Sequence, residues 1–96
     1  LSALNHPQIV KIFDFGVDSE QQPFMVMELV EGESLANVLS SGSLSVECSM
    51  DIALKVCLGI AHAHSKGIIH RDLKPANILV RNIEAADRQV TVVDFG

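Results

Sequence analysis

Apolar residues divide the first third of the chain into two extended runs with a polar stretch between them. Residues 9–13 (Ile-Val-Lys-Ile-Phe) and residues 24–30 (Phe-Met-Val-Met-Glu-Leu-Val) are rich in β-branched, aromatic and other apolar side chains, a composition typical of strands. Residues 16–23 contain Gly, Asp, Ser, Gln and Pro, which are typical turn residues. We therefore predict that the two runs form a β-hairpin. Residues 1–4 read as the end of a helix, which the proline at position 7 cannot continue.

The middle of the chain has the spacing of helices. Apolar residues at positions 35, 38 and 39 predict a short helix, with Ser34 as a plausible N-cap. Residues 43–66 predict a longer helix, which ends before Gly67. The apolar residues that recur in it at three and four positions are Met50, Ala53, Leu54, Cys57, Ile60 and Ala61. We expect this stripe to face a core.

A second hairpin is predicted near the C-terminus. Residues 78–80 (Ile-Leu-Val) and residues 90–93 (Val-Thr-Val-Val) are β-like runs separated by polar residues. Such a hairpin would place Asn77 and Asp94 at adjoining strand ends, where both side chains can reach one ion. Residues 68–69 (Ile-Ile) predict a further short strand.

Two motifs flank this second hairpin. Residues 70–77 read His-Arg-Asp-Leu-Lys-Pro-Ala-Asn, and residues 94–96 read Asp-Phe-Gly. The motifs specify eight positions, so a chance match at any given start is about one in 10^10. They resemble the catalytic loop and the metal-binding motif of eukaryotic-type (Hanks-type) serine/threonine protein kinases. The amino-acid sequence of several stretches is similar to that of bacterial members of this family.

The resemblance implies an α+β fold, namely part of the two-lobed protein kinase fold. The chain would hold the end of an N-lobe helix, two N-lobe strands, the hinge, two C-lobe helices, the catalytic loop and the hairpin that leads to Asp-Phe-Gly. Residues 1–27 would belong to the N-lobe, residues 28–34 to the hinge and residues 35–96 to the first part of the C-lobe. Because a kinase domain needs well over twice 96 residues, we expect a fragment that is inactive alone.

The resemblance also implies catalytic roles. Asp72 would orient a substrate hydroxyl and accept its proton, and Lys74 would place a positive charge beside the transferred phosphate. The lysine favours Ser/Thr substrates, because the tyrosine-specific branch usually lacks it. Asn77 and Asp94 would offer the hard oxygen ligands that Mg2+ prefers. The expected cofactors are therefore ATP and Mg2+, and the expected partner is a protein with a Ser or Thr hydroxyl.

Nucleotide contacts follow from the same resemblance. Glu28 and Val30 would bond the adenine edge through their backbone groups, and Met27 would be the gatekeeper at the back of the adenine pocket. Leu79 would form the floor of that pocket, and Ser34 aligns with a ribose contact. Each of these residues also has a purely structural explanation. Met27 fits equally well as a buried strand residue, and Leu79 as a residue of the core. For Ser34, helix capping is the simpler role.

Composition narrows the class of partners. The net charge is −5, and Lys and Arg are scattered, which argues against a nucleic-acid surface. The chain has no apolar run of 18 residues and thus no membrane segment. Cys48 and Cys57 would lie about 13 Å apart on one helix, too far to bridge. We read both as reduced, helix-packing thiols of a cytoplasmic protein, although a membrane anchor outside these residues stays open.

Two alternatives remain beside an active protein kinase. A pseudokinase or scaffold would share the fold but lack a catalytic residue elsewhere, such as the ATP-site lysine or its glutamate partner. A small-molecule phosphotransferase of related fold is the other alternative, but such enzymes usually lack the Arg71 and Lys74 pattern and the Asp-Phe-Gly motif. The histidines offer little support for a zinc site, because His62 and His64 are two residues apart and thus lie on different faces of a helix.

Overall fold

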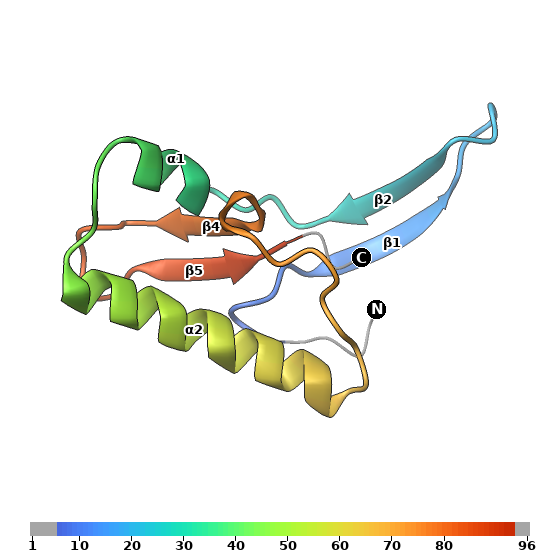
Figure 1. Cartoon of the computed structure of the whole chain (residues 1–96). Coiled ribbons are helices and arrows are strands. Elements are labelled where there is room, and N and C mark those ends of the chain that lie inside the picture. Colours follow the sequence, from blue (N-terminus) through green and yellow to red (C-terminus); the bar gives the residue numbers. More distant parts are fainter. Residues whose placement is uncertain (1–5, 94–96) are drawn as a thin grey trace.

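The computed structural model describes residues 6–93, which form a projecting hairpin and a small sheet packed against helices (Figure 1). The elements are β1 (Ile12–Val17), β2 (Pro23–Met27), β3 (Glu33–Ser34), α1 (Leu35–Ser40), α2 (Val46–Ser65), the 3₁₀ helix η1 (Pro75–Asn77), β4 (Ile78–Arg81) and β5 (Gln89–Val92). Strands β1 and β2 form one antiparallel sheet, and β3, β4 and β5 form a second sheet in that order. No helix within residues 6–93 is long and apolar enough to cross a membrane.

The first hairpin is confirmed, but the predicted bounds of its strands are wrong. Strand β1 begins three residues later than predicted and continues to Val17. The turn is short because the Asp18 carboxylate accepts hydrogen bonds from the main-chain N–H groups of Glu20 (2.8 Å) and Gln22 (2.9 Å). Gln21 adopts a positive φ of 63° within this turn. The side chain of one aspartate thus closes the hairpin more tightly than the turn composition suggested.

Residues 9 and 10, predicted to start the first strand, pair together with Gln8 against the second sheet instead. The Val10 N–H donates to the Val92 carbonyl (3.1 Å), and the Val92 N–H donates to the Gln8 carbonyl (2.8 Å). Ile9 forms a parallel bridge with Val92 and packs against Ala63 of α2. Burial of Ile9 and Val10 is the physical reason for this pairing, because the projecting hairpin offers them no comparable cover.

The second hairpin is confirmed as β4 and β5. Ile78 pairs with Val92 and Val80 with Val90, so these four side chains share one face of the sheet. That face packs on α2 (Figure 1). The buried cluster at this contact consists of Cys48, Ile52, Ile78, Val80 and Val90. The strand predicted at residues 68–69 does not form.

Helix α2 matches the predicted long helix. Its N-cap is Ser45, whose hydroxyl accepts from the Cys48 N–H at 3.1 Å. It ends at Ser65, and two residues later Gly67 takes a φ of 76° and donates its N–H to the His64 carbonyl at 2.9 Å.

The predicted buried face of α2 is wrong. Met50 and Leu54 are 68% and 59% exposed, and the predicted packing thiol Cys57 is exposed as well. The buried face is instead formed by Cys48, Ile52, Gly59 and Ala63. The helix has apolar residues on two faces, so helical spacing alone could not select the one that packs on the sheet.

Gly32 and Gly42 offer a matched test of the packing between β3 and β4. Their φ angles are +147° and +148°, so alanine is strained equally at both positions. An added Cβ at Gly32 would lie 2.8 Å from the Val80 carbonyl oxygen, whereas nothing lies within 4 Å of one at Gly42. We expect Gly32→Ala to lower the free energy of unfolding by about 1–3 kcal/mol more than Gly42→Ala. Urea denaturation of both variants measures this difference, and equal losses would contradict it.

Candidate active site

His70 fixes the geometry of the loop that follows α2. Its Nδ1 accepts the main-chain N–H of Asp72 at 3.0 Å, which requires that this nitrogen carry no proton. The proton therefore sits on Nε2, which donates to the Val93 carbonyl at 2.9 Å. The imidazole thus joins residue 72 to the end of the β4–β5 hairpin.

Asp72 lies between a cation and an amide. Lys74 Nζ is 3.3 Å from Asp72 Oδ2, and Asn77 Nδ2 donates to the same oxygen at 3.4 Å. The side chains of Asp72 and Lys74 are 61% and 54% exposed, so both charged groups are accessible to solvent. The structure therefore brings together three of the predicted site residues, Asp72, Lys74 and Asn77.

Asn77 is the buried member of this group. It ends the 3₁₀ helix η1, which begins with Pro75, and its Nδ2 also donates to the Asp72 main-chain carbonyl at 2.8 Å. Both of these hydrogen bonds to Asp72 use the amide nitrogen of Asn77 and not its amide oxygen. The Asn77 carbonyl accepts the Val93 N–H at 2.9 Å, which places Asn77 opposite the end of the hairpin.

The predicted partner of Asn77 in metal binding is Asp94, which directly follows Val93 in the sequence. Asp94, Phe95 and Gly96 lie outside the described residues, as does the helix end predicted at residues 1–4. Among residues 6–93, no group of three or more His, Cys, Asp or Glu side chains could hold a metal ion. His62 instead faces His6, with ring centroids 5.1 Å apart.

The predicted hinge, residues 28–34, begins directly after β2, which ends at Met27. The Glu28 N–H donates to the Lys11 carbonyl at 2.9 Å, and the Lys11 N–H donates to Glu28 Oε1 at 2.8 Å. Beyond this point the chain leaves the sheet, and Leu29 is 90% exposed. Val30 is half-buried. An ion pair of 3.4 Å between Glu31 and Arg81 ties the segment to β4.

Strand β3 was not predicted, because two residues are too few to show an alternating pattern. It pairs Ser34 with Leu79. The Ser34 hydroxyl accepts the Asn37 N–H at 3.1 Å, which confirms its role as the N-cap of α1. Leu79 is half-buried and points to the sheet face opposite Ile78 and Val80. This is the face that is not covered by α2.

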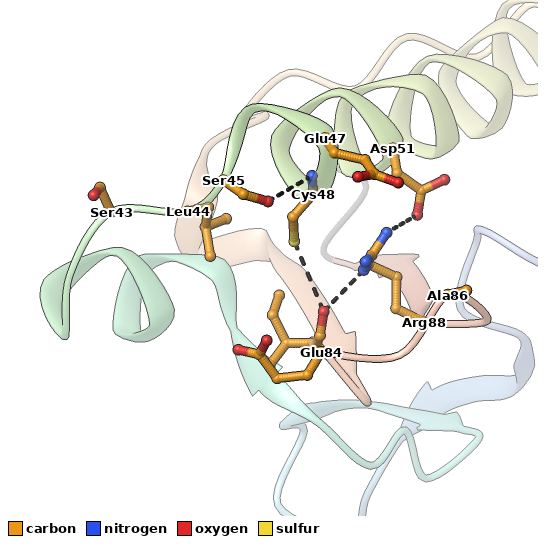
Figure 2. A pocket seen from close by; sticks show the side chains of 10 residues that line it. Ser43, Leu44, Ser45, Glu47, Cys48, Asp51, Glu84, Ala86 and Arg88 are labelled. Carbon is orange, nitrogen blue, oxygen red and sulfur yellow. Dashed lines mark hydrogen bonds and ion pairs between the residues drawn. The ribbon is translucent and has the colours of Figure 1, made fainter.

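A wide pocket of about 700 Å³ lies away from the catalytic loop, where α2 begins (Figure 2). Arg88 closes one side of it, and its side chain is only 11% exposed. Arg88 Nη1 donates to Asp51 Oδ2 at 2.6 Å, and Arg88 Nε donates to the Ile83 carbonyl at 2.9 Å. Lys55 Nζ is 3.1 Å from the same Asp51 oxygen and 2.6 Å from the Arg88 carbonyl. This network fastens the β4–β5 loop to α2.

The network makes stability depend on pH. A hydrogen bond from Arg88, which has the largest effect, and a second one from Lys55 lower the pKa of the Asp51 carboxyl below its ordinary value of 3.8. A depressed folded-state pKa contributes stability that is present above the unfolded value and is lost as the pH falls through the folded value. We expect thermal melts of wild type and Asp51→Asn to differ at pH 7 and to converge as the pH drops below about 4.

A control for this experiment is Asp87→Asn, which alters an exposed carboxylate of the same loop. Its melting temperature should follow that of the wild type across the pH range. A constant gap between the wild type and Asp51→Asn down to low pH would contradict the assigned role of Asp51.

Comparison with known proteins gives a consistent result. Residues 1–96 match the family described as the protein kinase domain. The chain is 44% identical over 96 residues to serine/threonine-protein kinase pkn2 of Myxococcus xanthus, a match that covers 100% of the chain and 11% of that protein. It is 36% identical over 99 residues to serine/threonine-protein kinase PknB of Mycobacterium tuberculosis, covering 99% of the chain and 15% of that protein.

Two solved structures share the fold. A crystal structure of Rad53 in complex with AMP-PNP has a TM-score of 0.86 and 37% identity, and the match covers 97% of this chain and 24% of that one. The kinase domain of Mycobacterium tuberculosis PknI has a TM-score of 0.81 and 27% identity, covering 96% and 37%. The chain spans 11%, 14% and 18% of three curated relatives.

Proposed function

Because the chain belongs to the protein kinase domain family, we propose that the full-length protein is a serine/threonine protein kinase. It transfers the γ-phosphate of ATP to a Ser or Thr hydroxyl of a protein. The observation that carries this proposal is the exposed Asp72 carboxylate, held between Lys74 and Asn77 by a loop that His70 fixes. Predicted fold and family are confirmed by the comparisons, whereas the roles of individual residues are our proposal.

Asp72 is the residue that handles the substrate hydroxyl. Its carboxylate accepts a hydrogen bond from the hydroxyl, aims the oxygen at the phosphorus, and takes the proton as the new bond forms. Phosphoryl transfer depends mainly on such positioning and on charge neutralisation. The fixed Asp72 main chain, bonded at its N–H by His70 and at its carbonyl by Asn77, supports this positioning role.

Lys74 supplies the positive charge for the transferred phosphate. In the structure its ammonium group pairs with Asp72 at 3.3 Å, and the lysine is exposed enough to turn toward a phosphate. The attraction between a compact ammonium group and a phosphate is stronger in a water-poor cleft than in bulk solvent. The ion pair thus places Lys74 beside the atom that receives the proton.

Asn77 and Asp94 are the proposed metal ligands. The oriented Asn77 amide, with its nitrogen on Asp72, leaves an oxygen of the kind that Mg2+ binds. A site with two protein ligands is compatible with Mg2+, which completes its coordination with phosphate oxygens and water. When bound, the ion neutralises charge on the phosphates.

The adenine site is proposed at the start of the hinge. The main-chain groups of Glu28 and Val30 bond the adenine edge, with Met27 behind it and Leu79 below it, while Ser34 contacts the ribose in addition to capping α1. Leu79 is half-buried and points to the sheet face that α2 does not cover, which supports this placement. We also propose residues 1–27 as N-lobe, residues 28–34 as hinge and residues 35–96 as the first part of the C-lobe.

The test is phosphoryl transfer by the full-length protein. Radiolabelled ATP with Mg2+ should label a protein substrate on serine or threonine, and the Asp72→Asn variant provides the catalytic control. Nucleotide binding without transfer would refute the proposal in favour of a pseudokinase or scaffold. Labelling of a small molecule but of no protein would instead identify a small-molecule phosphotransferase.

A further inference from the structure

The β1–β2 ladder ends at an irregular pair, Lys11 and Glu28. In a regular hydrogen-bonded antiparallel pair, the two residues exchange both main-chain N–H···O bonds. Here one bond is regular, because the Glu28 N–H donates to the Lys11 carbonyl at 2.9 Å. The other is not, because the Lys11 N–H donates to Glu28 Oε1 at 2.8 Å. The carboxylate of Glu28 therefore stands where its own main-chain carbonyl would be expected.

This substitution occurs where the chain turns out of the sheet. Strand β2 ends at Met27, one residue earlier, and the next residue, Leu29, is 90% exposed. A carbonyl bound to Lys11 would hold Glu28 in the extended ladder. With the carboxylate bound instead, the Lys11 N–H is satisfied and the main-chain carbonyl of Glu28 is released from the ladder.

We propose that the side chain of Glu28 is a positioning residue for the nucleobase. By occupying the Lys11 N–H, it keeps the main-chain carbonyl of Glu28 available to accept a hydrogen bond from the 6-amino group of adenine, which is a donor. This inference rests on the proposed function, in which the hinge main chain binds adenine. It goes further by assigning the choice of a 6-aminopurine to a side chain that does not itself touch the base.

The experiment compares two nucleotides in the full-length protein. ATP carries the 6-amino group, and purine riboside 5′-triphosphate lacks it. In Glu28→Ala the Lys11 N–H can recapture the main-chain carbonyl. We expect the KM for ATP to rise about fivefold, the effect of one net hydrogen bond, while the KM for the purine nucleotide stays within about twofold and kcat for ATP is unchanged.

Two further variants sharpen the comparison. Glu28→Gln keeps an acceptor oxygen at the same reach, so it should restore the wild-type preference for ATP. Asp18→Ala removes another carboxylate that binds main-chain N–H groups in the same hairpin, at the turn and away from the hinge. It should change stability but leave the ratio of the two KM values unchanged.

The outcomes separate positioning from simple stabilisation. A selective rise in the KM for ATP that glutamine reverses supports the proposal. An equal rise for both nucleotides, or no rise for either, overturns it and leaves the kinase activity itself intact. A wild-type protein that transfers no phosphate from ATP refutes the proposed function, and the inference with it.

Discussion

Asp72→Asn in the full-length protein is expected to lower kcat by about 10²–10⁴-fold while the affinity for ATP changes by less than about threefold. The range is that of a lost general base. Asparagine keeps the size of the side chain but cannot accept the hydroxyl proton. The main-chain bonds of residue 72 to His70 and Asn77 do not depend on the carboxylate, so the loop should keep its shape.

Steady-state kinetics with a peptide substrate and calorimetric titration with ATP measure the two quantities separately. Asp87→Asn is the matched control, because it makes the same chemical change at an exposed carboxylate in the loop at the opposite end of the β4–β5 hairpin. It should leave kcat and ATP affinity at their wild-type values. A turnover of Asp72→Asn equal to that of the wild type would remove Asp72 from the mechanism.

Asn77→Ala is expected to reduce the gain in ATP affinity that Mg2+ provides by a factor of about ten or more. The variant loses an oxygen ligand for the ion. It also leaves the Asp72 main-chain carbonyl without the 2.8 Å bond from the Asn77 amide, so kcat should fall as well. Titrations with ATP in the presence and absence of Mg2+ give the metal-dependent part of the affinity directly.

Asn77→Asp separates these two losses. Aspartate retains an oxygen ligand, so the dependence of ATP affinity on Mg2+ should remain, but it lacks the N–H groups that bind Asp72 and brings a second negative charge beside that carboxylate. We therefore expect low kcat with preserved metal dependence. Equal ATP affinity with and without Mg2+ in the wild type would contradict the assigned metal site.

The grouping of three of the proposed site residues was predictable from the sequence because they are neighbours along the chain. Asp72, Lys74 and Asn77 lie within six consecutive positions, and the η1 turn that brings them together begins at Pro75, a residue that fixes its own φ. The two hairpins and the Ser34 cap were also predictable, since apolar runs separated by polar turn residues, and N-cap residues, act on their near neighbours.

The rest depended on partners that are distant in the sequence. Helix α2 has two apolar faces, and only the position of β4 and β5 decides that Ile52 is buried and Leu54 is not. The bond from Arg88 to Asp51 joins residues 37 positions apart, and no pattern of composition marks it. The hydrogen bond from the Lys11 N–H to the Glu28 carboxylate, in place of the Glu28 carbonyl, likewise becomes apparent only when the register of the β1–β2 ladder is known.

The parallel bridge between Ile9 and Val92 affects the order in which the elements fold. These residues are 83 positions apart in the sequence. During synthesis, residues 8–10 therefore cannot pair with β5 until almost all of these 96 residues have left the ribosome. Contacts of such long sequence separation slow folding, whereas the β4–β5 hairpin can form locally. We infer that α2, β4 and β5 assemble first, and that residues 8–10 close this sheet late.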